Sequence, residues 1–289
     1  MTKSIKKSRL SKQSKQSKQS KQLSTKKTRK LRSRKIHSHE LVKHFDDNLT
    51  IPAYKIFHTP ANAELVLNLE EDQSVYANGG LMVWMNSTIK IKTEMGGLFA
   101  GLKRSFLGDG SLFLTTYTGT SNDGKSNKIC FSSELPGDII EIKIQPGEKK
   151  LIALGSIVVC TTNIKFDTKF RFSGIFTSGS AFLSQLSVDS NSSNYGIAWI
   201  ASFGSIDRLQ IKNGEKYIVD NQHFLECDAN VDYNISTLGG VKSALLSNQG
   251  FVINFHGPCE VLVQNKNFKN LAEKIIQMIP KNSHHHHQN

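Results

Sequence analysis

Three stretches of this sequence align with one another: Gln73-Ser-Val-Tyr-Ala-Asn-Gly-Gly80, Glu148-Lys-Lys-Leu-Ile-Ala-Leu-Gly155 and Glu215-Lys-Tyr-Ile-Val-Asp-Asn-Gln222. Their first residues, called anchors below, are separated by 148 − 73 = 75 and 215 − 148 = 67 positions. In the second and third copies a glycine directly precedes the anchor, as expected of a turn. Self-similarity at such a spacing indicates a duplicated structural unit.

The resemblance between the copies continues past these stretches. Twelve residues after each anchor stands a soft, apolar residue, namely Met85, Cys160 and Cys227, which predicts core positions rather than nucleophiles. Apolar and polar residues then alternate over 89–95, 164–170 and 231–235, the period of a half-buried strand. A glycine follows 24, 26 and 25 residues after the anchors, at Gly97, Gly174 and Gly240. Last strands are predicted at 111–117, 181–188 and 251–255.

The predicted fold is therefore all-β, of the sandwich or barrel type, because the units contain short strands and no long helix between them. We expect a body at 49–266 made of units at about 62–134, 135–203 and 204–266. Three related units are expected to close around a pseudo-threefold axis, which leaves fewer free sheet edges. Trp84 and Trp199 lie in strand-like runs and are expected in the core.

Several motifs resemble a known protein family. They are Ala77-Asn-Gly-Gly-Leu-Met-Val-Trp-Met85, the run from Met95 to Thr115 that contains Gly-Gly-Leu-Phe-Ala-Gly-Leu-Lys-Arg, and Leu135-Pro-Gly-Asp-Ile139. They resemble the altered-inheritance-of-mitochondria (mitochondrial biogenesis) family. The resemblance extends from about Glu64 to Asn265. It implies three fused units of double-stranded β-helix type, similar to the bacterial tryptophan-responsive RNA-binding attenuator. It implies no chemistry, and founding fungal members are associated with organisation of the mitochondrial inner membrane.

The basic residues are concentrated at the N-terminus. Residues 1–39 hold 15 Lys or Arg and no acid, which leaves 37 − 15 = 22 bases against 24 acids in the rest of the chain. Because residues 1–48 contain little that is apolar, we expect them to form a disordered tail. Its densest basic run, Lys26, Lys27, Arg29, Lys30, Arg32, Arg34 and Lys35, is the candidate polyanion-binding site.

Three interpretations of this tail remain open. In the first interpretation it is a polyanion-binding arm or nuclear-localisation patch. Basic residues near phosphates release counterions, which favours binding without sequence selectivity. Alternatively it is a mitochondrial presequence, although it is rich in Lys rather than Arg and its apolar residues are sparse. In the third interpretation it only solubilises the chain and has no partner.

The other end of the chain predicts one amphipathic helix at 267–280. Phe268, Leu271, Ala272, Ile275, Ile276 and Ile279 share one helical face, and Pro280 ends the pattern. We expect this helix to pack on the body rather than on a membrane, because Glu273 lies among its lysines. Residues 281–289 are expected to be a disordered end, in which His284–His287 is an incidental tract or expression remnant rather than a preorganised metal site.

One segment invites a phosphate-binding interpretation. Gly97 and Gly108 bracket Lys103 and Arg104, but the spacing is neither that of a P-loop nor that of a Rossmann motif. We expect instead a surface patch, apolar with a basic spot, that suits a membrane surface or a protein partner. Its residues are Leu98, Phe99, Leu102, Lys103, Arg104 and Phe106.

Catalytic, metal-ligating and cofactor-binding residues are not predicted. His223 and His256 have no Cys, Asp or Glu at metal-ligand spacing and are expected to be structural or exposed. The four cysteines lie too far apart for a Cys-x-x-Cys pair, so free, mostly buried thiols in a reducing compartment are expected. No stretch approaches the roughly 20 apolar residues of a transmembrane helix, and no secretory signal is recognised.

These observations favour a non-enzymatic scaffold or binding protein in the cytoplasm or nucleus. Its tail would bind nucleic acid or an acidic surface, and a homo-oligomer or protein partner is left open. The first alternative is a mitochondrial membrane-organising protein, like founding members of the family. The second is a ligand-binding or enzymatic double-stranded β-helix protein, which would need clustered histidines and carboxylates.

Overall fold

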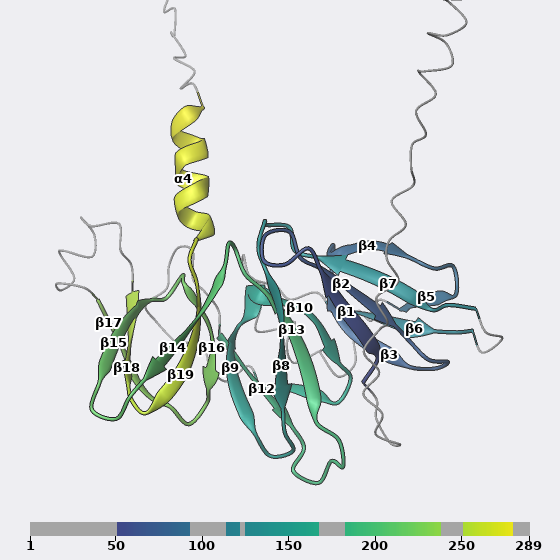
Figure 1. Ribbon diagram of the computed structural model, residues 1–289, viewed down its shortest axis with the longest axis horizontal. Coiled ribbons are helices and arrows are strands. Elements are labelled where there is room, and N and C mark those ends of the chain that lie inside the picture. Colours follow the sequence, from purple (N-terminus) through teal and green to yellow (C-terminus); the bar gives the residue numbers. More distant parts are fainter. Residues whose placement is uncertain (1–50, 93–113, 122–124, 168–182, 238–250, 280–289) are drawn as a thin grey trace, which may run out of the picture. The chain divides into compact units, whose positions relative to one another are not determined.

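The computed structural model describes residues 51–92, 114–121, 125–167, 183–237 and 251–279 (Figure 1). These residues form antiparallel β-sheets followed by one C-terminal helix, which confirms the predicted all-β class. The chain divides into two units, 1–40 and 41–289, and all the described residues belong to the second. No helix among them is long and apolar enough to cross a membrane.

Several predictions concern residues outside this description. They are the tail at 1–48, the glycines Gly97, Gly174 and Gly240, and the end at 281–289. The patch between Leu98 and Phe106 also lies outside the described residues.

The first part of the body contains seven strands. They are β1 (Ala53–Phe57), β2 (Glu64–Asn68), β3 (Ser74–Asn78), β4 (Met82–Met85), β5 (Ile89–Lys92), β6 (Leu114–Gly119) and β7 (Lys128–Ser132). Strands β1, β2, β7 and β4 form a four-stranded sheet in that order, and β5, β6 and β3 lie together in the next sheet. The three central residues of β2 and of β7 are consecutive apolar residues, and each strand has a partner strand on both sides, so both strands are largely buried.

Two further sets of six strands follow. The second set is β8 (Ile139–Ile144), β9 (Lys149–Ala153), β10 (Ile157–Thr161), β11 (Ile164–Asp167), β12 (Leu183–Val188) and β13 (Gly196–Ala201), with the short 3-10 helix η1 (Leu154–Ser156) before β10. The third set is β14 (Ile206–Ile211), β15 (Lys216–Asp220), β16 (Phe224–Asp228), β17 (Asp232–Thr237), β18 (Phe251–His256) and β19 (Cys259–Gln264).

The same pairing scheme recurs in β2–β7, β8–β13 and β14–β19. In each set the sixth strand lies between the first and the third, and the fifth lies between the second and the fourth. The third strand of each set also carries a register shift near its start, between Met82 and Trp84, between Ile157 and Val159, and between Phe224 and Glu226. A bulge of this kind bends the strand and re-aims its side chains.

Neighbouring sets share sheets. Strand β3 pairs with β10, and β9 pairs with β16, so each of these junctions joins two half-sheets into one six-stranded sheet. Below, the term junction means such a pairing between strands of different sets. Strand β15 pairs with β18 and β4 pairs with β7, and each is the terminal strand of its sheet.

The three anchors occupy the same kind of turn, immediately before β3, β9 and β15. A side-chain oxygen of each anchor accepts a hydrogen bond from the backbone N–H three residues earlier, at 2.9, 2.8 and 2.9 Å for Gln73, Glu148 and Glu215. The residue before each anchor has a left-handed φ of 58°, 81° or 82°, at Asp72, Gly147 and Gly214. Glycine adopts this conformation without strain, and Asp is among the few other residues that tolerate it.

Apolar side chains fill the space between successive sheets. Strands β10 and β13 are buried on both faces, because Val159 and Trp199 contact one core cluster while Cys160 and Ala198 contact the next. A third cluster, which includes Phe224, joins β16 and β19 to β15 and β18. Trp199 is fully buried, as expected, but Trp84 is 43% exposed because the edge of β4 has no described neighbour.

Helix α4 (Phe268–Met278) begins at the cap Asn267, whose side chain accepts a hydrogen bond from the N–H of Asn270 at 2.8 Å. The predicted helix is confirmed, but the described part of the body does not bury its apolar face, contrary to the expectation that it packs there. None of its residues is buried by described parts of the chain. Its large apolar side chains are 36% to 82% exposed: Phe268, Leu271, Ile275, Ile276, Met278 and, directly after it, Ile279.

Candidate functional site

Both candidate sites predicted from the sequence lie outside the described residues. This holds for the basic run from Lys26 to Lys35 and for the patch from Leu98 to Phe106. The structure instead brings together a polar cluster that the sequence did not reveal, at the junction of β9 and β16. We define this Lys150 cluster by Lys150, Glu148, Glu226 and Asp228.

Strand pairing places these four side chains together. Lys150 lies opposite Asp228, and Glu226 lies opposite Ile152. Glu148 is the anchor just before β9, so it stands two residues from Lys150 on the same side of the strand. The register shift between Phe224 and Glu226 turns the latter inward, so that only 5% of its surface is exposed.

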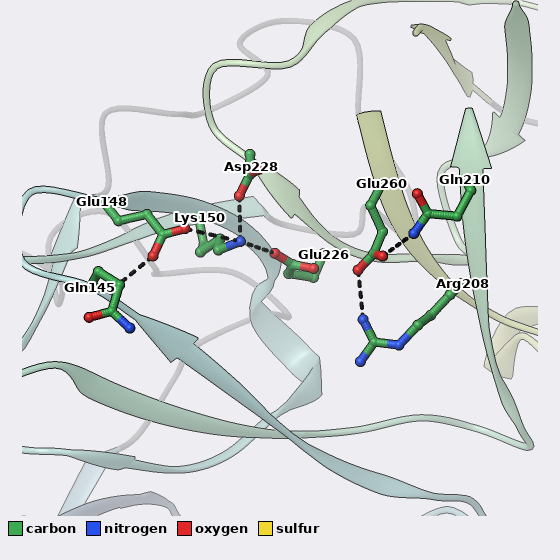
Figure 2. A network of polar contacts seen from close by, with 8 residues as sticks. All are labelled: Gln145, Glu148, Lys150, Arg208, Gln210, Glu226, Asp228 and Glu260. Carbon is green, nitrogen blue, oxygen red and sulfur yellow. Dashed lines mark hydrogen bonds and ion pairs between the residues drawn. The ribbon is translucent and has the colours of Figure 1, made fainter. Parts of the chain in front are cut away.

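The ammonium group of Lys150 contacts three carboxylates. Its Nζ lies 3.4 Å from Glu148 Oε1 and 3.4 Å from Glu226 Oε1, and it donates a short hydrogen bond to Asp228 Oδ1. Figure 2 shows these contacts converging on Lys150, with the backbone of Gln145 hydrogen-bonded to Glu148 beside them. The cluster therefore carries an excess of negative charge around one cation.

The carboxyl group of Glu226 is the most perturbed acid of the cluster. Burial raises its pKa to about 7, although the charge and hydrogen bond of Lys150 act in the opposite direction. Burial alone would lower the pKa of Lys150, but its hydrogen bond to Asp228 and the three carboxylate charges raise it above the usual range. A raised pKa of Glu226 is compatible with a raised pKa of Lys150, because Glu226 shares this one cation with two other carboxylates.

The arrangement determines what the cluster can do chemically. A lysine with a raised pKa stays protonated, so Lys150 is unsuited to act as a nucleophile or base. Glu226 has a pKa suited to proton transfer near neutral pH. Its Oε1 faces Lys150 across the strand pair, and its side chain is 6% exposed. The geometry supports a buried ionic link between β9 and β16 that titrates near pH 7.

A second polar group lies on the same sheet. Glu260 on β19 accepts hydrogen bonds from Arg208, at 2.6 Å, and from Gln210 on β14 (Figure 2). The side chains of Arg208 and Glu260 are 55% and 40% exposed, so water screens this pair strongly. The negative charge of Glu260 contributes slightly to the raised pKa of Glu226.

The aligned anchors contain the signal that could have revealed the Lys150 cluster. Eleven residues after the anchors stand Trp84, Val159 and Glu226, and two residues after them stand Val75, Lys150 and Tyr217. A charged residue thus replaces an apolar or aromatic one at both positions around one junction. These two charged residues, Lys150 and Glu226, are recognised as an ion pair only when β9 is known to lie beside β16.

His223 has the structural role expected of it. Its Nδ1 lies 2.6 Å from the backbone carbonyl oxygen of Gln264, and its Nε2 lies 3.1 Å from the side-chain amide nitrogen of Asn267. Because a carbonyl only accepts, Nδ1 carries the proton and Nε2 accepts from the amide. His223 lies in the turn before β16, and its ring therefore links the last residue of β19 to the cap residue of α4.

His256 has a carboxylate neighbour that is distant in the sequence. Its Nδ1 lies 2.9 Å from Asp232 Oδ2, because the two residues are directly opposite on β18 and β17. The Asp232 side chain is 77% exposed, so this is a surface contact. Within the described ranges, no three His, Cys, Asp or Glu side chains lie together as metal ligands would.

The four cysteines are free, and three of them are buried, as predicted. Burial raises the pKa of Cys130 to about 12 and raises the pKa values of Cys160 and Cys227 further, so these thiols are poorly reactive at neutral pH. A shallow hollow of about 380 Å³ lies beside β2 and β7, and its lining is mostly amide, hydroxyl and lysine side chains. Asn127 in its wall hydrogen-bonds the backbone of Leu69 and Ser121, which is a structural role.

Comparisons with known proteins give consistent results. The family model described as mitochondrial biogenesis AIM24 matches residues 54–266. An uncharacterised protein of Streptococcus pyogenes serotype M6 is 23% identical over 257 residues, which cover 86% of this chain and 98% of that protein. A crystal structure of a Streptococcus pyogenes protein matches with a TM-score of 0.63 and 20% identity, over 78% of this chain and 99% of that one. This structural likeness shows the fold alone.

Proposed function

This chain belongs to the mitochondrial biogenesis AIM24 family, and from that premise we propose that it is a non-enzymatic scaffold or binding protein. Its β body provides a platform, and its basic N-terminal segment binds a polyanion. The observation that carries this proposal is the charge distribution, 15 bases and no acid in residues 1–39 against 22 bases and 24 acids in the rest. A segment of this composition attracts phosphates while the body does not.

The proposal includes an architecture for the platform. The body consists of three attenuator-like units, each a set of six strands. The recurring strand pairing, the repeated bulge and the identical anchor turns support this assignment. A platform of joined sheets suits assembly and docking, because it presents several strand edges and turns to a partner.

The polyanion hypothesis is tested by a salt titration of binding. The full-length chain and a chain that starts at Leu41 are compared for affinity to a mixed-sequence nucleic acid. We expect binding without sequence preference, with log K falling by about 0.7 to 0.9 per neutralised phosphate for each tenfold rise in salt. Replacing the bases from Lys26 to Lys35 by glutamine should abolish most binding, whereas changing Lys103 and Arg104 should have little effect.

Two outcomes would contradict it. Equal affinity for the full-length and shortened chains would assign the binding to the body. A salt slope that stays the same after neutralisation of the basic run would remove the tail from the interface. The melting temperatures of the two chains should agree within a few degrees, because the tail contributes little apolar burial.

A role at a mitochondrial membrane surface is the second candidate, and helix α4 favours it. Its apolar face is exposed, with Ile275 at 52% and Ile276 at 65%. An amphipathic helix with such a face can lie in the interface of a lipid bilayer, and nearby lysines favour acidic lipids. Flotation with vesicles that contain cardiolipin tests this role. Binding that disappears on Ile275→Glu but persists without residues 1–40 would favour α4 over the tail.

A further inference from the structure

Two strands of the body, β4 and β15, each have one edge that pairs with no strand of the described part of the chain. Strand β4 ends the sheet β1-β2-β7-β4, and β15 begins the sheet β15-β18-β17. The corresponding strands of the pairing scheme do have partners at these edges. Strand β10 pairs there with β3, and β16 pairs there with β9. At both junctions, the second strand of one set pairs with the third strand of the following set. Strand β15 is a second strand without a following set, and β4 is a third strand without a preceding set.

The exposed apolar side chains gather on these same strands. Outside α4 and the residue after it, five large hydrophobic residues are exposed among those that the structure describes, and four of the five lie on β4 and β15. They are Val83 at 52%, Trp84 at 43%, Tyr217 at 40% and Ile218 at 61%. Where the junction is formed, the residues that correspond to Val83 and Trp84 on β10, Val158 and Val159, are 1% and 0% exposed. Apolar edge strands of this kind are templates for pairing with another strand.

The two formed junctions share one register when positions are counted from the anchors. In both, the residue 11 after one anchor lies opposite the residue 4 after the preceding anchor, as for Val159 and Ala77 or for Glu226 and Ile152. Positions 12 and 3 pair likewise, and so do positions 13 and 2. The same count applied to the two free edges brings Trp84 opposite Val219, Met85 opposite Ile218 and Asn86 opposite Tyr217. This register places the exposed Ile218 opposite the half-buried Met85 and the exposed Trp84 opposite the apolar Val219, so each edge offers an apolar residue to the other.

We propose that β15 of one chain pairs antiparallel with β4 of a second copy of this chain, in this register. The partner is a second copy because the two edges are complementary to each other and the described part of one chain leaves both of them open. Each copy then offers one edge of each kind, so copies join head to tail through the junction that already joins strand sets within the chain. Such a heterologous contact builds a ring if the rotation closes and a filament if it does not. Main-chain hydrogen bonds provide the ladder, and the apolar residues provide the buried area.

The register is tested by mixing two variants, each of which gains one cysteine beside the four native ones. Residues directly opposite in an antiparallel pair have Cβ atoms about 4.5 to 5.5 Å apart, close enough for a disulfide after a small adjustment. Met85→Cys protein and Ile218→Cys protein, oxidised together, should give a covalent pair of twice the 32.2 kDa chain mass. Neither variant should give this heterodimer alone. Replacing the second variant by Val219→Cys, which turns the thiol to the opposite face, should abolish it.

A second measurement does not depend on cysteine chemistry. Light scattering of the wild-type protein should give a molar mass that is a multiple of 32.2 kDa, and Ile218→Lys should reduce it to 32.2 kDa. The fluorescence of Trp84 should shift to longer wavelength in the same variant, because its edge becomes wet. Ile91→Lys is the matched control: Ile91 is also exposed, at 43%, but lies on β5, and its substitution should leave the mass unchanged.

Three results would overturn the proposal. The first is a wild-type mass of 32.2 kDa at every concentration tested. The second is a mixture of the two single variants without a heterodimer. The third is a disulfide that forms only within one chain of the double variant Met85→Cys/Ile218→Cys, because the chain would then close its own ring.

Discussion

The junctions β3–β10 and β9–β16 have the same backbone register and contain different side chains. At β3–β10 the residues Val75 and Val159 are both 0% exposed and belong to one apolar core cluster. At β9–β16 the corresponding residues are Lys150 and Glu226, an ion pair whose side chains are 17% and 6% exposed, within a cluster of four charges. The first junction belongs to an ordinary hydrophobic core, whereas the second depends on protonation.

The difference shows that the strand ladder, and not one set of side chains, defines the junction. A backbone ladder can be closed by apolar burial or by an ion pair, because both satisfy the groups that face each other. What changes is the response to conditions. An apolar junction is insensitive to pH, whereas the buried cluster couples the stability of the sheet to the protonation of Glu226.

The largest expected effect comes from putting a charge into the apolar junction. Val159→Glu copies the residue of the other junction without its lysine, so a carboxylate is buried with no cation nearby. We expect the free energy of unfolding to fall by about 4 kcal/mol. Urea denaturation measures the change, with Val159→Thr as the control for polarity without charge. A loss of unfolding free energy no larger than that of the threonine variant would show that water reaches this junction.

The reverse exchange should cost less. Lys150→Val leaves Glu226 buried among like charges, and we expect a loss of about 3 kcal/mol. The double variant Lys150→Val/Glu226→Val copies the apolar junction and should recover to within about 1 kcal/mol of the wild type. A double-mutant cycle by urea denaturation gives the coupling. Additive losses from the two single changes would mean that the ion pair contributes nothing specific.

The pH dependence separates the two junctions further. Because the folded-state pKa of Glu226 is raised from 4.5 to about 7, the folded protein binds more protons than the unfolded chain between these values. The free energy of unfolding therefore decreases as pH rises through this window, by at most about 1.4 kcal/mol per pH unit. Glu226→Gln should remove this contribution. If the difference in stability between the wild type and this variant stays constant from pH 4.5 to 7, the raised pKa is wrong.

The smallest effect is expected from the exposed pair on the same sheet. Arg208 and Glu260 are about half exposed, so Arg208→Ala should change the stability by no more than about 0.5 to 1 kcal/mol. Added salt should shrink even this change, because ions screen exposed charges. Thermal unfolding at low and high salt measures it. A loss comparable to that of Lys150→Val would place Arg208 within the buried cluster.

Local patterns were sufficient to predict several elements of the chain. The alternation after Ile164 predicted β11, and the helical spacing after Phe268 predicted α4, because each signal depends on neighbours within a few residues. The burial of Cys160 and Cys227 also followed from their place in the aligned stretches. The binding role of the tail is still a prediction, since it rests on composition alone.

The sequence by itself determined the strand periodicity, the anchor turns and the segregation of charge, since all three are written in residues close together along the chain. Only the tertiary structure decided which strands meet. It put Lys150 opposite Asp228, 78 residues away, and it left one edge of β4 and one edge of β15 without a partner strand in the described chain. It also left the apolar face of α4 uncovered by the described parts of the chain. Contacts between distant residues depend on how whole sheets pack, and a local pattern contains no information about the strand on the other side of a junction.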